Sequence, residues 1–260
     1  MADESEPPVW APPLLALQFL TRLPVPVLDR LSGAQVTIGL GRAVGWFPLV
    51  GALIGAITAG AVLATADFWP RAVAVIIALI IEARLTGAFH EDAVADFCDA
   101  FGGGQSPEQV RTIMKDSRIG SYGALGLGLA VLLRAGLLIS LDPAVMVIAI
   151  IASATFARLL VVIAMAAIPP APAGTGIAKD IGSAIGWRQL ALASLVALPG
   201  LLPLVLVQPL ALAAAVAVGA VFLWWFRGLL MHRIGGSTGD CLGFAAYAGQ
   251  LLLLLAVVAH

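Results

Sequence analysis

Residues 143–168 read PAVMVIAIIASATFARLLVVIAMAAI, a run in which Arg158 is the only charged side chain. A helix needs about 20 mostly apolar residues to cross roughly 30 Å of hydrocarbon, and this run is long enough. Pro143 favours a helix start, because proline fits the first helical turn but cannot continue a helix. The run therefore predicts a transmembrane helix.

The composition of the whole chain agrees with a membrane protein. Of the 260 residues, 61% are hydrophobic and only 11% are charged, and the mean hydropathy is +1.03. Soluble domains contain about 25% charged residues, so a soluble fold is excluded. The net charge of -1, without a clustered basic face, gives no reason to expect a nucleic-acid partner.

Six further runs have the length and composition of a membrane span. They are 43–65, 71–89, 121–141, 189–207, 209–231 and 241–259. Gly51 and Gly55 have the spacing that lets helices approach closely in lipid. The stretch from Trp10 to Leu20 is too short to span, and we expect an interfacial or half-inserted helix there. The sequence therefore predicts an all-α bundle of about seven transmembrane helices.

The basic residues predict the orientation, because cytoplasmic loops carry an excess of Lys and Arg. With seven spans, one set of loops holds only Arg71. The other set holds Arg22, Arg30, Arg42, Arg111, Lys115, Arg118, Lys179, Arg188, Arg227 and Arg233. We therefore place the N-terminus in the cytoplasm and the C-terminus outside, in a bacterial inner membrane. The polar loops 90–120, 169–188 and 232–240 then share the cytoplasmic face.

The organisation along the chain is simple. Residues 1–9 are acidic and lack the basic start of a secretory signal, so we expect a short disordered tail. No repeat and no low-complexity segment suggests a second domain. Residues 10–260 are therefore predicted to form a single integral membrane domain.

The first polar loop carries acidic residues at helical spacing. If residues 90–100 form a helix, Asp92, Asp96 and Asp99 lie on one narrow stripe, while apolar residues cover the rest. Three like charges repel, and their oxygen atoms suit Mg²⁺, which also takes phosphate oxygens. The stripe therefore predicts a magnesium site that bridges carboxylates and a substrate phosphate. The alternative is a solvated acidic face on a loop helix.

Two basic side chains precede the span at 121–141. Lys115 and Arg118, three residues apart, share one helix face and suit phosphate oxygens beside a metal. Their alternative role is a cytoplasmic anchor beside a membrane helix. Between these residues and the acidic stripe, the glycines at 102–104 are expected to end one helix, and Ser106 to cap the next.

The last polar loop, 233–243, is rich in glycine and hydroxyl groups. Its backbone N–H groups lie near a helix N-terminus, which is a common place to hold an anionic group. Asp240 offers one further carboxylate for a metal. The alternative is a flexible turn with a helix cap.

Several ionisable residues fall inside the predicted spans. They are Glu82, Arg84, Arg134 and Arg158. Buried charges are costly, so these side chains are expected either to pair with one another or to line a substrate cavity. His90 and Glu91 project away from the acidic stripe, and each either orients the structure or takes part in the chemistry.

Four motifs in order resemble the cobalamin synthase family, also called adenosylcobinamide-GDP ribazoletransferases, over nearly the whole chain. They read QFLTRLP at 18–24, TGAFHEDAVADFCD at 86–99, MKDSRIGSYG at 114–123 and GGSTGDCLG at 235–243. The family usually has Asp-Gly-Leu-Ala-Asp in the second of these, where this chain has Ala93 and Val94. A further family glycine is replaced by Ala100. Small residues at these positions keep the helix and its carboxylates, but they put a close approach of the backbone in doubt.

The resemblance implies the last step of nucleotide-loop assembly in vitamin B12 synthesis. The hydroxyl of α-ribazole, or of its 5′-phosphate, attacks the cobinamide-side phosphorus of adenosylcobinamide-GDP, and GMP leaves. Magnesium on Asp92, Asp96 and Asp99 would neutralise the pyrophosphate, while Lys115 and Arg118 would stabilise charge on GMP. Asp116 or Asp92 would accept the hydroxyl proton.

The resemblance also suggests which residues contact the substrates. They are His90, Ser117, Gly235, Gly236, Thr238, Asp240 and Arg158. Besides the two substrates, we expect membrane lipid around the bundle. A homo-oligomer, or an association with other enzymes of the corrinoid pathway, is compatible with the sequence.

Two other functions compete with this one. A lipid-type CDP-alcohol phosphotransferase also uses aspartates and Mg²⁺ at a membrane boundary, but its usual motif continues into Ala-Arg, which does not follow Asp92 and Asp96 here. A transporter would use the charged residues within the spans as a pathway. Transporters typically show inverted repeats and polar breaks at the midplane of two spans, and the sequence shows neither.

Overall fold

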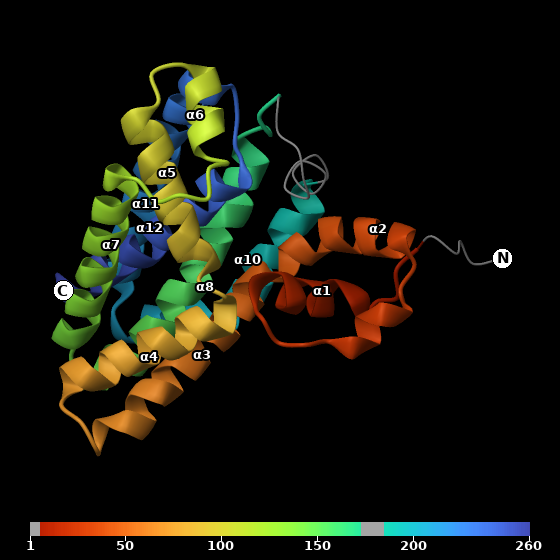
Figure 1. Ribbon diagram of the computed structural model, residues 1–260. Coiled ribbons are helices and arrows are strands. Elements are labelled where there is room, and N and C mark those ends of the chain that lie inside the picture. The colour runs from red at the N-terminus through yellow and green to blue at the C-terminus, as the bar shows by residue number, and fades with distance from the viewer. Residues whose placement is uncertain (1–5, 173–184) are drawn as a thin grey trace.

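The computed structural model describes residues 6–172 and 185–260 and contains long helices without a β-strand in those ranges (Figure 1). The helices before the middle of the chain are α1 (Ala11–Leu20), α2 (Gly33–Ala43), α3 (Phe47–Ala66), α4 (Arg71–Thr86), α5 (Phe89–Gly103), α6 (Pro107–Ile113) and α7 (Ser121–Ser140). Those that follow are α8 (Pro143–Ala167), α10 (Trp187–Val207), α11 (Pro209–Ile234) and α12 (Gly239–Val258). The predicted all-α class is confirmed.

Six helical segments in the described ranges are long and apolar enough to cross a membrane. They are Gly33–Ala66, which joins α2 and α3, and the helices α7, α8, α10, α11 and α12. A seventh span requires α4 and α5 together, and these are bent by 88°. The prediction of about seven spans in a multi-pass membrane protein is confirmed. The sidedness of the termini stays a prediction.

Helix α8 lies at the centre of the bundle and packs against α3, α10 and α12. Its contact with α3 depends on the two glycines with the predicted spacing. A Cβ atom on Gly51 would meet the backbone oxygen of Ala154, and one on Gly55 would lie 2.8 Å from the Cα of Ile151. The absence of side chains at these positions therefore lets the two helices touch along their backbones.

The C-terminal boundary of the span predicted over 71–89 is wrong, because α4 ends at Thr86 and the chain turns before α5 begins at Phe89. Gly87 and Ala88 both adopt left-handed backbone conformations, with φ of 71° and 56°. Left-handed φ is accessible to glycine but rare for alanine, so Ala88 is held in a strained conformation. Arg22 fixes the break from outside, since its backbone N–H donates to the carbonyl of Leu85 at 2.7 Å. The acidic stripe therefore lies on a separate helix, α5.

The N-terminal segment, which contains α1 and α2, packs against the bundle through the contact of α1 with α3. Helix α1 has ten residues, too few to span, and its length agrees with the predicted short helix. A capping box between Ser32 and Gln35 starts α2. Of the predicted tail, residues 1–5 lie outside the described residues, whereas Glu6 pairs with Arg42 at 2.7 Å. Lys179 and most of the loop 169–188 also lie outside the described residues.

Candidate active site

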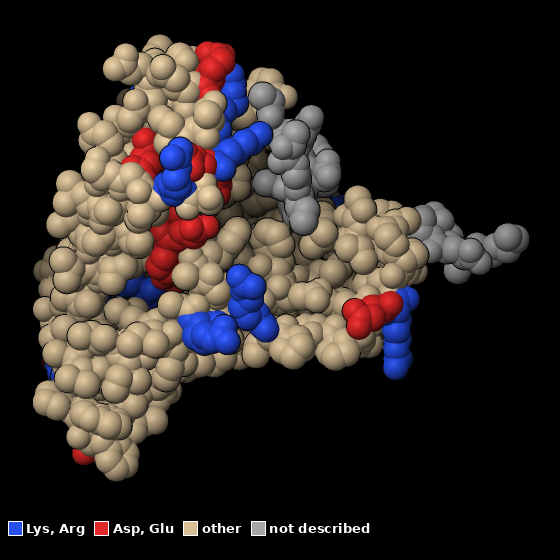
Figure 2. Space-filling view, in the orientation of Figure 1, with Lys and Arg blue, Asp and Glu red and all other residues tan. Residues whose placement is uncertain are grey.

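Three polar segments that are far apart in sequence meet at one end of the bundle. Helix α5 packs against α7 and α12. The hydroxyl of Thr238 donates to the sulfur of Met114 at 3.1 Å, and the guanidinium of Arg233 donates to the carbonyl of Gly104 at 2.6 Å. Figure 2 shows acidic side chains in one hollow of this surface, with Lys and Arg side chains around it. The second, third and fourth motifs thus build one site.

The predicted helix over 90–100 is confirmed as α5, and its aspartates form the centre of the site. Asp92 is exposed, and Asp96 and Asp99 are half-buried. Partial burial, together with the negative charges of Asp92, Asp240 and Asp99, raises the pKa of Asp96 to about 6. Asp240, at the start of α12, therefore belongs to the same acidic cluster. Four neighbouring carboxylates repel one another when all are ionised.

Asp99 differs from the other three because it already has partners. Its two carboxylate oxygens accept hydrogen bonds from the backbone N–H groups of Gly120 at 2.6 Å and Gly123 at 2.8 Å. These donors belong to the first turn of α7, where backbone N–H groups lack helical partners. A carboxylate there is also favoured by the helix dipole. Asp99 therefore docks α7 on α5, whatever else it binds.

The acidic cluster fits a hard divalent cation as an open site. Within the described residues, no three His, Cys, Asp or Glu side chains converge closely enough to hold a metal by themselves. Magnesium is usually bound through one or two carboxylates, with waters and substrate phosphates completing the octahedron. Oxygen donors and the mutual repulsion around Asp96 suit such an ion. The assignment of Mg²⁺ to Asp92, Asp96 and Asp99 stays a prediction.

The basic motif at 115–118 borders the acidic cluster. Lys115 and Ser117 are exposed and carry no side-chain bond in the described structure. Arg118 instead forms a two-point ion pair with Asp116, at 2.7 and 3.0 Å. Hydrogen bonds from Arg118 lower the pKa of Asp116 to about 2. Such an acidic carboxylate is a weak proton acceptor, so its contact with Arg118 indicates an orienting role.

The glycine-rich turn at 235–238 is ordered by the segment that follows α8, and its threonine caps α12. Gly235 ends α11 with φ of 76°, and a Cβ on Gly236 would lie 2.5 Å from the carbonyl oxygen of Pro169. The backbone N–H of Ser237 donates to that carbonyl at 2.8 Å. The hydroxyl of Thr238 accepts from the N–H of Cys241 at 3.3 Å. The predicted helix cap is therefore present, and the turn is held from two sides.

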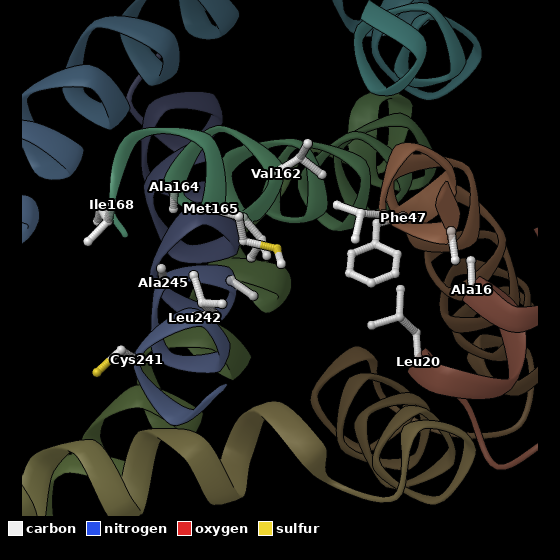
Figure 3. Packing of buried hydrophobic residues seen from close by; sticks show 14 of the residues in the cluster. Ala16, Leu20, Phe47, Val162, Ala164, Met165, Ile168, Cys241, Leu242 and Ala245 are labelled. Atoms are coloured by element: carbon white, nitrogen blue, oxygen red, sulfur yellow. The ribbon is translucent and has the colours of Figure 1, made fainter. Parts of the chain in front are cut away.

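Behind the acidic cluster lies a small apolar cavity of about 50 Å³. Figure 3 shows Leu20 and Phe47 on one side of it, and Met165 and Leu242 on the other. Its polar lining comes from Arg158 and His90, which are 2% and 7% exposed. The Nε atom of Arg158 has no hydrogen-bond partner among the described residues. A buried N–H group without a partner is costly, so the Nε atom of Arg158 favours a substrate group that accepts hydrogen bonds in this cavity.

The remaining buried charged residues form a structural network. The sequence alone did not decide whether they pair with one another or line a cavity. Glu82 of α4 accepts from Arg134 of α7 at 2.7 Å and from Thr58 of α3 at 2.7 Å. Arg134 also lies 3.7 Å from Glu91 of α5 and stands over the ring of Tyr247 of α12. Arg134 therefore joins four helices around the base of α5. Arg84 is exposed and takes no part in it.

Sequence reasoning identified Glu82 and Arg134 as candidates for a pair but could not connect them. They lie 52 residues apart, and no spacing within one helix links them. For Glu91 the sequence left open whether it orients the structure or takes part in the chemistry, and its 3.7 Å approach to Arg134 favours the orienting role. Thr58 and Tyr247 carried no signal, because their contacts with Glu82 and Arg134 form only when the helices pack.

The glycine-to-alanine departures in the acidic motif have a packing explanation. Ala93 is buried against Gly243 of α12, and a Cβ on Gly243 would collide with the Cβ of Ala93. Ala100 is also fully buried. Both alanines therefore face the bundle, away from the exposed Asp92, and they leave the carboxylates in place.

Comparison with known proteins gives one consistent family. The family model described as Cobalamin-5-phosphate synthase matches residues 12–258. A protein of Ralstonia pickettii named adenosylcobinamide-GDP ribazoletransferase is 35% identical, with 96% of each chain covered. Proteins with that name from Ralstonia nicotianae and Shewanella amazonensis are 38% and 37% identical, with 93–94% of each chain covered. No solved structure matches.

Proposed function

Because the chain belongs to the cobalamin-5-phosphate synthase family, we propose that it is an adenosylcobinamide-GDP ribazoletransferase. It joins the cobinamide phosphate of adenosylcobinamide-GDP to α-ribazole or α-ribazole 5′-phosphate and releases GMP. The observation that carries this proposal is the meeting of α5, the 114–123 segment and the start of α12 around one acidic cluster. A pyrophosphate substrate requires such a combination of cation-binding and anion-binding groups.

The acidic side of the site would hold Mg²⁺. The carboxylates of Asp92 and Asp240 act electrostatically on Asp96, and Asp99 adds its charge while it docks α7. The ion, when bound, neutralises the negative charge of the pyrophosphate. This role explains why a stripe of carboxylates persists on a helix whose other faces are buried.

The basic side of the site would bind the leaving nucleotide. Lys115 and Arg118 are exposed next to the cluster, and Asp116 holds the guanidinium of Arg118 in one orientation. Arginine pairs with phosphate oxygens through two parallel hydrogen bonds, so orientation matters. The exposed hydroxyl of Ser117 would offer a further donor. In the turn at 235–238, the N–H of Gly235 and the hydroxyl of Thr238 already donate within the protein, so their predicted contact with a substrate requires an exchange of these bonds.

The cavity behind the cluster would take an uncharged or anionic acceptor group of one substrate. Arg158 and His90 supply its buried polar atoms. Asp92 remains the candidate proton acceptor for the attacking hydroxyl, since the pKa of Asp116 is held at about 2.

The proposed activity is tested by GMP release from the purified protein. The reaction contains adenosylcobinamide-GDP, α-ribazole 5′-phosphate and Mg²⁺, with omission of each component and addition of EDTA as comparisons. We expect GMP only when metal and both substrates are present. Release without the ribazole would indicate hydrolysis instead of transfer, and no release from a folded preparation would contradict the proposal.

A further inference from the structure

A groove that the proposed reaction does not use lies between the N-terminal part and the start of α10. Its volume is about 630 Å³. The polar side chains on its wall are Arg42, Arg188 and Gln189, and the aromatic ring of Trp46 lies beside them. Both arginines are exposed. The groove is thus wide, accessible and basic on a chain with few charges.

This groove lies at the start of two apolar helices, α3 and α10. Trp46 directly precedes α3, Arg42 lies in the last turn of α2, and Arg188 is the second residue of α10. Both helices are about 30 Å long, which matches the hydrocarbon thickness. Tryptophan and arginine at helix ends are typical of the headgroup level of a bilayer. The groove therefore opens where lipid phosphates lie.

A second groove continues in the direction of the bilayer interior. Its volume is about 490 Å³, and its lining is almost entirely apolar. Leu49, Leu53 and Ala56 of α3 line it opposite Pro199 of α10. Consecutive residues in the first turn of α1 line the two grooves, with Pro12 on the basic groove and Pro13 on the apolar one. From Trp46 to Ala56 the helix rises about 15 Å, which is comparable to most of an acyl chain.

We propose that the paired grooves form a binding site for an anionic glycerophospholipid. Its phosphate lies between Arg42 and Arg188, and one acyl chain lies along α3 and α10 in the apolar groove. Charge complementarity favours an anionic over a zwitterionic headgroup, at about fivefold in affinity for each arginine near the surface. The site is distinct from the acidic cluster and does not depend on the proposed reaction.

The ion pair between Glu6 and Arg42 competes with the proposed lipid phosphate. The carboxylate of Glu6 pairs with Arg42 at 2.7 Å, and both side chains are about half exposed. An exposed ion pair contributes little to stability, so a lipid phosphate can displace it. Removal of the Glu6 charge should therefore strengthen lipid binding rather than weaken it.

Native mass spectrometry of the delipidated full-length protein tests the site directly. The probe is palmitoyl-oleoyl phosphatidylglycerol, with palmitoyl-oleoyl phosphatidylcholine and inorganic phosphate as comparisons. For the double variant Arg42→Gln and Arg188→Gln, we expect a loss of phosphatidylglycerol affinity of at least about tenfold. The control Arg227→Gln removes an exposed arginine of α11 and should leave the affinity unchanged.

Two single variants keep the test informative if the double variant unfolds. Glu6→Gln should raise phosphatidylglycerol affinity, and Ala56→Phe should lower the affinity for both lipids by filling the apolar groove. Ala64→Phe, on an exposed part of the same helix outside the groove, is the matched control. Equal binding of phosphatidylglycerol and phosphatidylcholine, or no change in any of these variants, would overturn the proposal. Binding of inorganic phosphate alone at the same site would replace the lipid with a soluble anion and also overturn it.

Discussion

Asp99 of α5 caps α7 through the backbone N–H of Gly123, at 2.8 Å. The contact joins the helix that carries the acidic cluster to the segment that carries Lys115 and Arg118. It also explains a glycine that the sequence alone left unexplained, because a Cβ on Gly123 would lie 2.8 Å from the carbonyl oxygen of Ala95 and would collide with Asp99.

The first prediction follows from that contact. Gly123→Ala should lower both thermal stability and transferase activity, since the new methyl group must push α5 and α7 apart. Thermal unfolding in detergent and GMP release provide the two measurements. Gly128→Ala is the matched control, because a Cβ on Gly128 of the same helix meets nothing within 4 Å. Equal behaviour of the two variants would show that the capped contact is unimportant.

The second prediction concerns the packing of α5 on α12. Gly243→Ala should destabilise the protein, because its methyl group collides with that of Ala93. Ala93→Gly in the same chain removes the collision and should restore much of the lost unfolding temperature. Overpacking of a core costs about 1–3 kcal/mol, so both changes are measurable. Absence of rescue in the double variant would contradict the assigned contact.

The third prediction concerns the buried pair of Glu82 and Arg134. Replacement of either residue leaves an uncompensated buried charge and should cost about 3–5 kcal/mol of stability. The double variant Glu82→Leu and Arg134→Met removes both charges and should be more stable than either single variant. Chemical denaturation of all three reports the coupling. Arg84→Gln, an exposed change on the same helix, should have little effect.

The fourth prediction is a pH dependence of the metal-free protein. Partial burial and neighbouring carboxylates raise the pKa of Asp96 to about 6, whereas an unfolded aspartate titrates near a pKa of about 4. The native state therefore holds a proton that the unfolded state has lost, and stability should fall as pH rises between these values.

The unfolding temperature at pH 4.5 and at pH 7 in EDTA, with ionic strength held constant, measures this effect. The difference between the two values should shrink in Asp96→Asn, which cannot ionise. Exposed Asp67→Asn, at the α3 end, is the control and should keep the wild-type difference. A difference that is identical in all three proteins would assign the pH dependence to other groups.

Much of the fold could be predicted because each membrane span is a continuous run of about 20 mostly apolar residues. The run 143–168 predicted α8, and the spacing of Gly51 and Gly55 predicted close helix packing, although the partner of these glycines, α8, is seen only in the structure. The break at Gly87 and Ala88 was missed, because apolar residues continue through it and only the backbone conformation reveals the turn. A window of composition cannot detect two left-handed residues.

The candidate site was also predicted only in part from the sequence. The carboxylates at 92, 96 and 99 were found from helical spacing, and a helix cap was one of the two alternatives for the last polar loop, where the structure has Thr238 as the cap. The special position of Asp99, the pairing of Asp116 with Arg118 and the network around Arg134 depend on contacts between segments. Their geometry is set by packing, which a single sequence does not record.

We propose that the acidic cluster binds the magnesium that the transfer requires. The most direct test of this claim is a Mg²⁺ titration of GMP release at pH 7.5 by the wild-type protein, Asp96→Asn and the control Asp67→Asn. We predict that Asp96→Asn loses about 100-fold or more of its activity and needs more Mg²⁺, while Asp67→Asn matches the wild type. Full turnover by Asp96→Asn with an unchanged Mg²⁺ requirement would contradict the claim.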